Sequence, residues 1–92
     1  MNRFVLKLSP TATRDLDRLE ARSARAILGK LTILEDNPFP KGKMIKKLKG
    51  MRSTFYRLRV GDYRIFYSVE GREVAVLRVI LKKDAGKFIK GL

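Results

Sequence analysis

The chain has 92 residues, 45% of them hydrophobic, so it is long enough for one domain with a modest core and too apolar for a disordered chain. It carries 22 Lys and Arg residues against 9 Asp and Glu, a formal net charge of +13, which indicates a polyanionic partner such as nucleic acid or an acidic protein. The sequence has no cysteine, which excludes disulfides and thiol catalysis, and no histidine, which removes the usual general base and the commonest metal ligand.

The sequence gives no sign of export or of a membrane span. No apolar run approaches the roughly 18 residues that cross a bilayer, and the apolar N-terminal run is too short for a signal peptide. We therefore expect residues 1–92 to form a single cytoplasmic domain with no membrane partner.

The first part of the chain predicts one strand and two helices. Residues 3–8 alternate between apolar and other side chains, as in a strand. Ser9 followed by Pro10 predicts a capped helix over residues 10–20. Ser23 is the candidate cap of a second helix that ends before Asn37-Pro38. We interpret its apolar stripe as core, and the stripe comprises Ala24, Ile27, Leu28, Leu31 and Leu34.

A loop is predicted over residues 37–42, and the charge changes abruptly after it. Between Lys41 and Arg64 there are nine basic residues and one acid, a net charge of +8. Ile45 and Leu48 are expected to anchor this basic segment to the body of the domain. The lysines expected to face outwards are Lys46, Lys47 and Lys49.

Two strands joined at Gly61-Asp62 organise the centre of the chain, because apolar and other residues alternate on both sides of this Gly-X pair. The predicted register pairs Val60 with Tyr63, Leu58 with Ile65, Tyr56 with Tyr67 and Arg59 with Arg64, with Arg57 diagonal to the two arginines.

Like charges placed opposite each other on a sheet destabilise it by a few tenths to about 1 kcal/mol. Three guanidiniums on one face therefore indicate an anionic ligand, and phosphate is the natural candidate. Phe55 and Phe66 share this face and are expected to be exposed rings, which suits the stacking of RNA bases. The three tyrosines of these strands are instead expected on the core face.

The last part of the chain predicts a central strand over residues 74–81, which are almost continuously apolar. A three-residue loop at residues 70–72 would place Arg78 opposite Arg64, whereas a two-residue loop would turn Arg78 inwards, and we favour the first. Residues 82–92 are basic and contain Gly86 and Gly91, so only a short or frayed turn is expected there, with Phe88 and Ile89 packed inwards.

The order of these elements is β-α-α-β-β-β. It predicts an α+β fold in which two N-terminal helices pack on one face of a small antiparallel sheet. The opposite face is expected to be open and basic.

The central residues resemble those of a known family. Lys47-Leu48-Lys49-Gly50, the run from Tyr56 to Ile65, and Tyr67-Ser68-Val69 are similar to the RelE toxins of the RelE/ParE superfamily of toxin–antitoxin pairs. The resemblance extends over the whole chain in length and element order. It implies an endoribonuclease that cuts mRNA in the ribosomal A site by attack of the ribose 2′-OH on the adjacent phosphate, with no metal and no cofactor.

The resemblance also implies partners and site residues. The partners are a small acidic or amphipathic RelB-like antitoxin, the ribosome and its mRNA, and promoter DNA only through the antitoxin complex. The implied catalytic residues are Arg57, Arg59, Arg64, Lys82 and Lys83. The implied RNA-binding residues are Lys46, Lys47, Lys49, Arg52, Phe55, Phe66, Arg78, Lys87 and Phe88.

Two departures from the family pattern bear on mechanism. Arginines stand where some relatives carry lysine on the second strand, and arginine holds its proton too tightly to act as a base. Lys82 or Lys83 is then the candidate base. The C-terminal segment has Phe88 and lacks the tyrosine of many relatives, and phenylalanine can stack but cannot exchange a proton.

Two other functions fit the sequence. One is a ParE-like toxin of the same fold that inhibits DNA gyrase, and the other is a non-catalytic RNA-binding module. We favour the nuclease because of the arginine and lysine cluster. Since Arg64 is expected to be a crowded, exposed charge, its replacement by alanine should abolish cutting without loss of stability.

Overall fold

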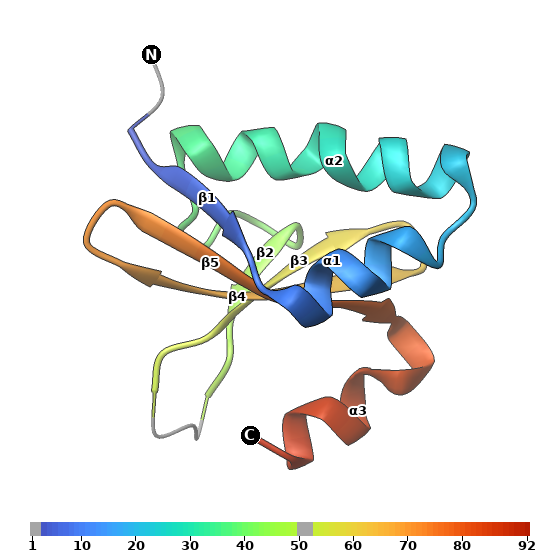
Figure 1. Ribbon diagram of the computed structural model, residues 1–92. Helices are drawn as coiled ribbons and strands as arrows, with labels where there is room; N and C mark the ends of the chain where they lie inside the picture. Colours follow the sequence, from blue (N-terminus) through green and yellow to red (C-terminus); the bar gives the residue numbers. More distant parts are fainter. Residues whose placement is uncertain (1–2, 50–52) are drawn as a thin grey trace.

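The computed structural model describes residues 3–49 and 53–92 and has an α+β fold, as the sequence predicts (Figure 1). In chain order, the elements are β1 (Val5–Leu8), α1 (Pro10–Asp17), α2 (Ala21–Asp36), β2 (Ile45–Lys47), β3 (Tyr56–Val60), β4 (Tyr63–Glu70), β5 (Glu73–Leu81) and α3 (Lys82–Lys90).

Within the described ranges, five strands form one sheet in the order β1-β5-β4-β3-β2. β1 pairs with β5 in parallel, and the other neighbouring strands are antiparallel. The expectation of a purely antiparallel sheet is therefore wrong at β1. Parallel pairing requires a long crossover, and the helices and strands between β1 and β5 provide one.

The first helix begins where the sequence predicts. The Ser9 hydroxyl oxygen accepts a hydrogen bond from the backbone N–H of Ala12 at 3.0 Å, and the same hydroxyl donates to the Leu77 carbonyl at 2.9 Å. Ser9 thus caps α1 and fastens it to β5. The helix ends at Asp17, before the predicted end at Glu20.

The second helix begins earlier than expected. α2 starts at Ala21, so Ser23 is not its cap, and the Ser23 hydroxyl donates instead to the Glu20 carboxylate at 3.3 Å. Ile27, Leu31 and Leu34 of the predicted stripe are buried. Leu28 is 46% exposed, because it lies outside the arc of α2 that faces the sheet.

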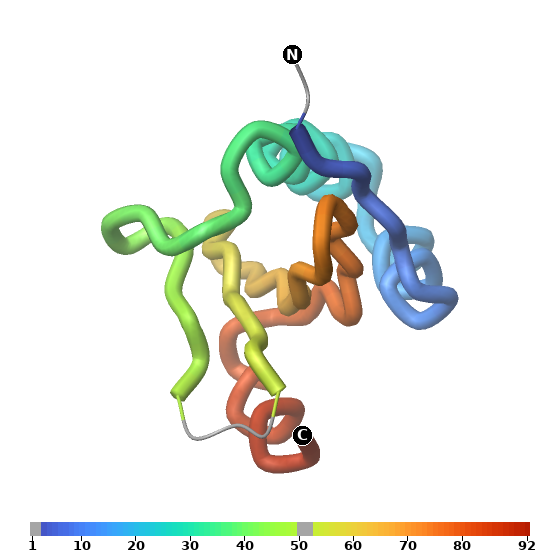
Figure 2. Tube along the Cα trace, turned by 90° about the vertical axis from the view of Figure 1, so that its left-hand side faces the viewer, coloured from blue at the N-terminus to red at the C-terminus, as the bar shows by residue number. Residues whose placement is uncertain are grey.

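Figure 2 shows α2 on one side of the sheet and α3 on the other. The main core lies on the α2 side, where apolar residues of α1 and α2 pack on strand residues that include Leu58, Ile65 and Tyr67. Tyr56 and Tyr67 stack in this core, and Tyr63 packs against it, so the predicted core position of the tyrosines is confirmed.

The central hairpin has the predicted register. Val60 pairs with Tyr63, and Arg59 lies opposite Arg64. Gly61 adopts a φ of 55°, which only glycine adopts without strain, so the two-residue turn forms at the predicted position.

The next turn differs from the expectation. Glu70 pairs with Glu73, so the β4–β5 loop has two residues. Further along the two strands, Phe66 pairs with Arg78 and Tyr67 with Val76, so Leu77 is an extra residue in the β4–β5 pairing. This bulge returns Arg78 to the face of the arginines, where it lies opposite Phe66. The prediction that Arg78 faces Arg64 is wrong, because a bulge cannot be foreseen from alternation alone.

Two further elements were not predicted. Residues 45–47 form β2, which pairs with β3 at the edge of the sheet. Residues 82–90 form a regular helix, α3, where only a frayed turn was expected. Its Phe88 packs on Phe66, which is fully buried, so the face opposite α2 is covered at this point and the prediction of an exposed Phe66 is wrong.

Candidate phosphate-binding site

Six cationic side chains line one hollow of about 360 Å³ on the α3 side of the sheet. We call this hollow the basic pocket. Its lining contains Phe66, Ala85 and Ile89 and the cations Lys43, Lys46, Arg57, Arg59, Arg64 and Lys82, with no carboxylate among its described lining residues.

The strands determine how these cations converge. Arg59 and Arg64 lie directly opposite each other on β3 and β4, and Arg57 lies opposite Phe66. Lys46 of β2 lies opposite Arg57. Because side chains of paired residues project from the same face of a sheet, the three strands place their cations side by side.

Arg64 is held rigidly at the base of the hairpin turn. Arg64 is only 7% exposed, and its Nη1 donates to the carbonyls of Gly61 at 2.9 Å and Tyr63 at 2.8 Å. The expectation of an exposed Arg64 is therefore wrong. These two hydrogen bonds stabilise the hairpin turn, so Arg64 has a structural role in addition to the positive charge that it contributes to the basic pocket.

Arg57 is half-buried and lies close to the charges of Arg59 and Arg64. Its Nη2 donates to the Lys43 carbonyl at 3.0 Å, which fixes the guanidinium, while its Nε is buried without a hydrogen-bond partner in the described structure. Burial lowers the pKa of Arg57 from its usual value, and the charges of Arg64 and Arg59 lower it further. An anion bound beside Arg57 would relieve this repulsion.

The helix α3 forms one wall of the basic pocket. The backbone N–H of Lys82 donates to the Asp62 carbonyl at 2.7 Å, which ties the start of α3 to the turn of the hairpin. The centroids of the Phe66 and Phe88 rings lie 4.8 Å apart, and this contact holds the helix against β4. Lys82 and Ala85 therefore line the pocket from the side opposite β2.

Arg78 is already paired with a carboxylate. Its Nε and Nη2 donate to Asp15 at 2.8 and 3.2 Å, and its guanidinium lies 5.9 Å from the centre of the Phe88 ring. The hydrogen bond and charge of Asp15 raise the pKa of Arg78, although burial opposes them. We do not include Arg78 among the phosphate ligands, because its charge is matched within the protein.

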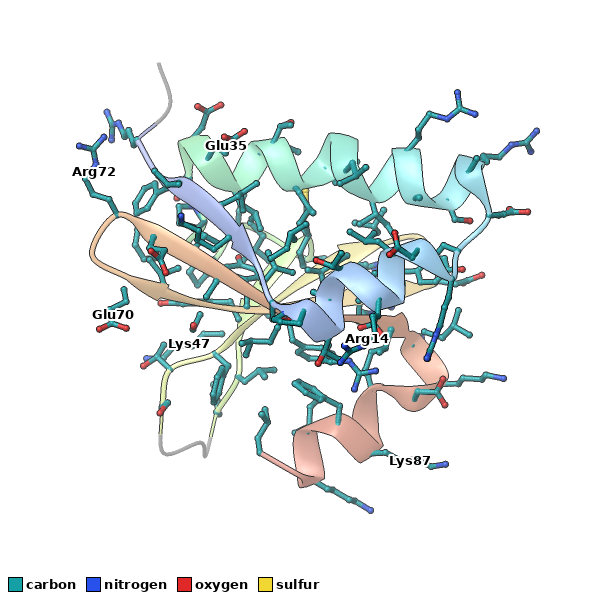
Figure 3. All side chains as sticks on the ribbon, in the orientation of Figure 1. Arg14, Glu35, Lys47, Glu70, Arg72 and Lys87 are labelled. Carbon is teal, nitrogen blue, oxygen red and sulfur yellow. The ribbon has the colours of Figure 1, made fainter. Side chains whose placement is uncertain are left out.

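The remaining predicted residues lie outside the lining of the basic pocket. Lys83 is exposed and lines a neighbouring hollow with Asp62, and Lys87 extends away from α3 (Figure 3). Lys47 and Lys49 are exposed, and Phe55 is half-buried. Phe88 is half-buried and occupied by its contact with Phe66. Arg52 lies outside the described residues.

Sequence reasoning gave Lys43 no role, and it placed Lys46 among the RNA contacts rather than in this cluster. The missing information was that residues 45–47 are a strand beside β3. The sequence contains one signal of this strand. Apolar Ile45 stands next to Lys46 in a basic stretch, and a change from an apolar to a charged residue is typical of a short strand.

A larger hollow of about 630 Å³ lies elsewhere on the molecule and is a poorer phosphate site. Asp36 contributes a carboxylate to its lining, and the Arg72 Nε donates to the Arg3 carbonyl at 3.0 Å. Arg72 and Glu35 lie at this end of the molecule (Figure 3). The basic pocket is the better candidate, since only cations contribute charge to it.

Neither a membrane-spanning helix nor a cluster of three or more metal-ligating His, Cys, Asp or Glu side chains occurs among residues 3–49 and 53–92.

Comparison with known families gives a match over most of the chain. Residues 6–85 match the family described as "ParE toxin of type II toxin-antitoxin system, parDE". No curated protein sequence matches the chain.

Several solved structures are similar to this one. The RelE–RelB complex from Pyrococcus horikoshii contains a chain 30% identical to this one, with a TM-score of 0.75 over 87% of this chain and 96% of that one. The RelBE2 toxin–antitoxin complex of Mycobacterium tuberculosis gives 26% identity and a TM-score of 0.75, over 86% and 98% of the two chains. The isolated RelE toxin of E. coli, at 22% identity, shares the fold, with a TM-score of 0.72 over 94% and 98%.

Proposed function

Because the chain belongs to the RelE/ParE superfamily of type II toxin–antitoxin toxins, we propose that it is a ribosome-dependent endoribonuclease that cuts mRNA in the A site. The observation that carries this proposal is the basic pocket, in which six cations meet with no carboxylate in the described lining. Such a pocket suits a phosphodiester that gains negative charge as it reacts.

The chemistry assigned to the pocket is attack of a ribose 2′-OH on the adjacent phosphate. The O2′–P bond forms as the P–O5′ bond breaks, and the products are a 2′,3′-cyclic phosphate and a free 5′-OH. Arg57, Arg59 and Arg64 hold the phosphate and stabilise its additional charge. A well-placed donor of this kind contributes about 3 kcal/mol, or roughly a hundredfold in rate.

Proton transfer falls to lysine in this site, because arginine does not release its proton in proteins. We propose that Lys82, and not Lys83, acts on the reacting atoms, because Lys82 lines the basic pocket, whereas Lys83 lines only the neighbouring hollow. The sequence made Lys82 or Lys83 the candidate base; we propose instead that Lys82 transfers a proton to the departing O5′. Exposed Lys47 and Lys49 are proposed to contact RNA beyond the reacting phosphate.

We propose a RelB-like antitoxin as the partner in a cytoplasmic toxin–antitoxin pair. The similar structures include the RelE–RelB complex from Pyrococcus horikoshii and the RelBE2 toxin–antitoxin complex, and the net charge of +13 on this chain suits an acidic partner. Contact with promoter DNA is proposed only through that complex.

The decisive experiment adds the purified protein to ribosomes that are translating a defined mRNA and maps the 5′ ends by primer extension. Cuts within codons, with cyclic phosphate and 5′-OH ends, are expected with the wild type, and the Arg57→Ala variant should cut at least a hundredfold more slowly. The Lys30→Ala variant is the matched control, because Lys30 is exposed on α2, on the other side of the sheet.

A second candidate, inhibition of DNA gyrase, is favoured by the description of the matching family as ParE toxins. The same preparation is therefore tested in a gyrase supercoiling assay. Inhibition of gyrase with intact mRNA would replace the nuclease proposal. Binding of RNA without cutting and without an effect on gyrase would leave a non-catalytic RNA-binding module.

A further inference from the structure

We infer that Lys46 of β2 is the general base that removes the proton from the attacking 2′-OH. This inference rests on the nuclease function proposed above and assigns the proton acceptor within the same site.

The direction of the Lys46 side chain follows from the pairing of β2. Ile45 pairs with Leu58 and is 1% exposed, so it points into the main core. Since successive strand residues point to opposite faces, Lys46 projects to the α3 side of the sheet. It lies opposite Arg57 there and lines the basic pocket.

Few groups in the basic pocket can accept a proton. Its described lining holds no carboxylate and no tyrosine, and the whole chain lacks histidine. The three arginines of the lining retain their protons. The candidates are therefore the amines of Lys43, Lys46 and Lys82. Lys43 precedes β2 and is not fixed by a strand, although its carbonyl anchors Arg57.

The two remaining lysines stand on opposite sides of the arginines. β2 forms one edge of the sheet, β3 and β4 carry Arg57, Arg59 and Arg64, and Lys82 directly follows β5, which lies beyond β4 in the strand order. The attacking and departing oxygens at phosphorus lie roughly in line, so the base and the acid must approach from opposite sides. Lys46 and Lys82 have this arrangement.

The proton count closes in this scheme. The neutral amine of Lys46 takes the 2′-OH proton as the O2′–P bond forms. The ammonium of Lys82 gives a proton to O5′ as the P–O5′ bond breaks. The enzyme ends with one proton gained and one lost, and exchange with solvent restores both lysines.

The test measures single-turnover cutting of ribosome-bound mRNA by wild type, Lys46→Arg and Lys46→Ala, with Lys30→Arg as the control. Lys46→Arg keeps the charge but cannot act as a base, so a rate loss of about a hundredfold or more is expected, with ribosome affinity within threefold of wild type. Exogenous ethylamine should restore cutting by Lys46→Ala and leave the wild-type rate unchanged. A second readout uses mRNA whose bridging 5′ oxygen is replaced by sulfur, a leaving group that needs no acid. This substrate should rescue Lys82→Arg and not Lys46→Arg.

Other results would overturn the inference. Full activity in Lys46→Arg would mean that only charge is needed, and rescue of Lys46→Arg by the sulfur substrate would make Lys46 the acid. Failure of amines to restore Lys46→Ala, when circular dichroism shows it folded, would also reject the role of base. If the wild type cuts no mRNA, the proposed function itself fails, and the inference fails with it.

Discussion

Replacing Asp15 with alanine tests how α1 is fastened to the sheet. Asp15 is 9% exposed and accepts three hydrogen bonds, from Arg78 Nε at 2.8 Å, from Arg78 Nη2 at 3.2 Å and from the Val79 backbone N–H at 2.9 Å. β1 ends opposite Val76, so no strand of the described part of the chain lies beside the next part of the β5 edge. The carboxylate of α1 satisfies that edge instead.

The cost of the substitution can be worked from these contacts. Loss of the acceptor for the buried Val79 N–H costs about 1–3 kcal/mol. The ion pair adds at most about 1 kcal/mol, because the Arg78 side chain is 33% exposed and water can solvate it after the change. Alanine returns about 0.5 kcal/mol, since it favours the helix more than aspartate does. The free energy of unfolding should therefore fall by about 0.5–3.5 kcal/mol, with a central value of about 2 kcal/mol.

Urea denaturation followed by circular dichroism measures this change, and a loss of about 2 kcal/mol should lower the midpoint of thermal unfolding by about 8–16 °C. Asp15→Asn is the matched control, because its amide oxygen can still accept from the Val79 N–H, whereas the charge and the acceptor for Arg78 Nη2 are lost, so a decrease of about 1 kcal/mol is expected. A loss below about 0.5 kcal/mol in Asp15→Ala would refute this account of the edge. Equal losses in the two variants would show that the charge, and not the acceptor, holds α1.

Three further predictions concern the hairpin, the core tyrosine and α3. Arg64→Ala should lower the free energy of unfolding by about 2 kcal/mol in a urea titration, because two charged hydrogen bonds to turn carbonyls are lost. Arg59→Ala changes an exposed residue and should be neutral or slightly stabilising in the same titration. Unchanged stability in Arg64→Ala would contradict the structural role of Arg64. Burial and the neighbouring Tyr56 raise the pKa of Tyr67 above its usual value of 10.0. The wild type should therefore lose stability as the pH rises beyond about 10, because the phenol ionises first in the unfolded chain. Tyr67→Phe lacks the phenol and its 2.6 Å hydrogen bond to the Pro38 carbonyl, so it should not show this pH-dependent loss of stability. Parallel pH dependence of unfolding in the two proteins between pH 9 and pH 11 would oppose that assignment. Phe88→Ala removes the ring contact that holds α3, so amide exchange in residues 82–90 should accelerate at least tenfold while exchange in β4 and β5 beyond Phe66 stays slow; unchanged exchange in α3 would show that other contacts hold the helix.

The local elements that the sequence predicted well are those set by short-range rules. The Ser9-Pro10 cap determines where α1 begins, and the Gly61-Asp62 turn determines the register that brings Arg59 opposite Arg64. The predicted site residues Arg57, Arg59, Arg64 and Lys82 all line the basic pocket, and their catalytic roles remain predictions. Alternation failed to predict the partner of Arg78, because the extra residue Leu77 shifts the register of the β5 residues that follow it relative to β4.

Sequence alone determined the charge, the hairpin and the arginine face, because each depends on residues close together in the chain. Only the tertiary structure decided which lysines join that face, since Lys46 arrives on an edge strand and Lys82 on a helix whose position depends on the packing of Phe88 against Phe66. The tertiary structure also determined that Arg78 forms its ion pair with Asp15, a residue 63 positions away in the chain. Pairing across such distances depends on how helices and strands pack, and periodicity carries no information about it.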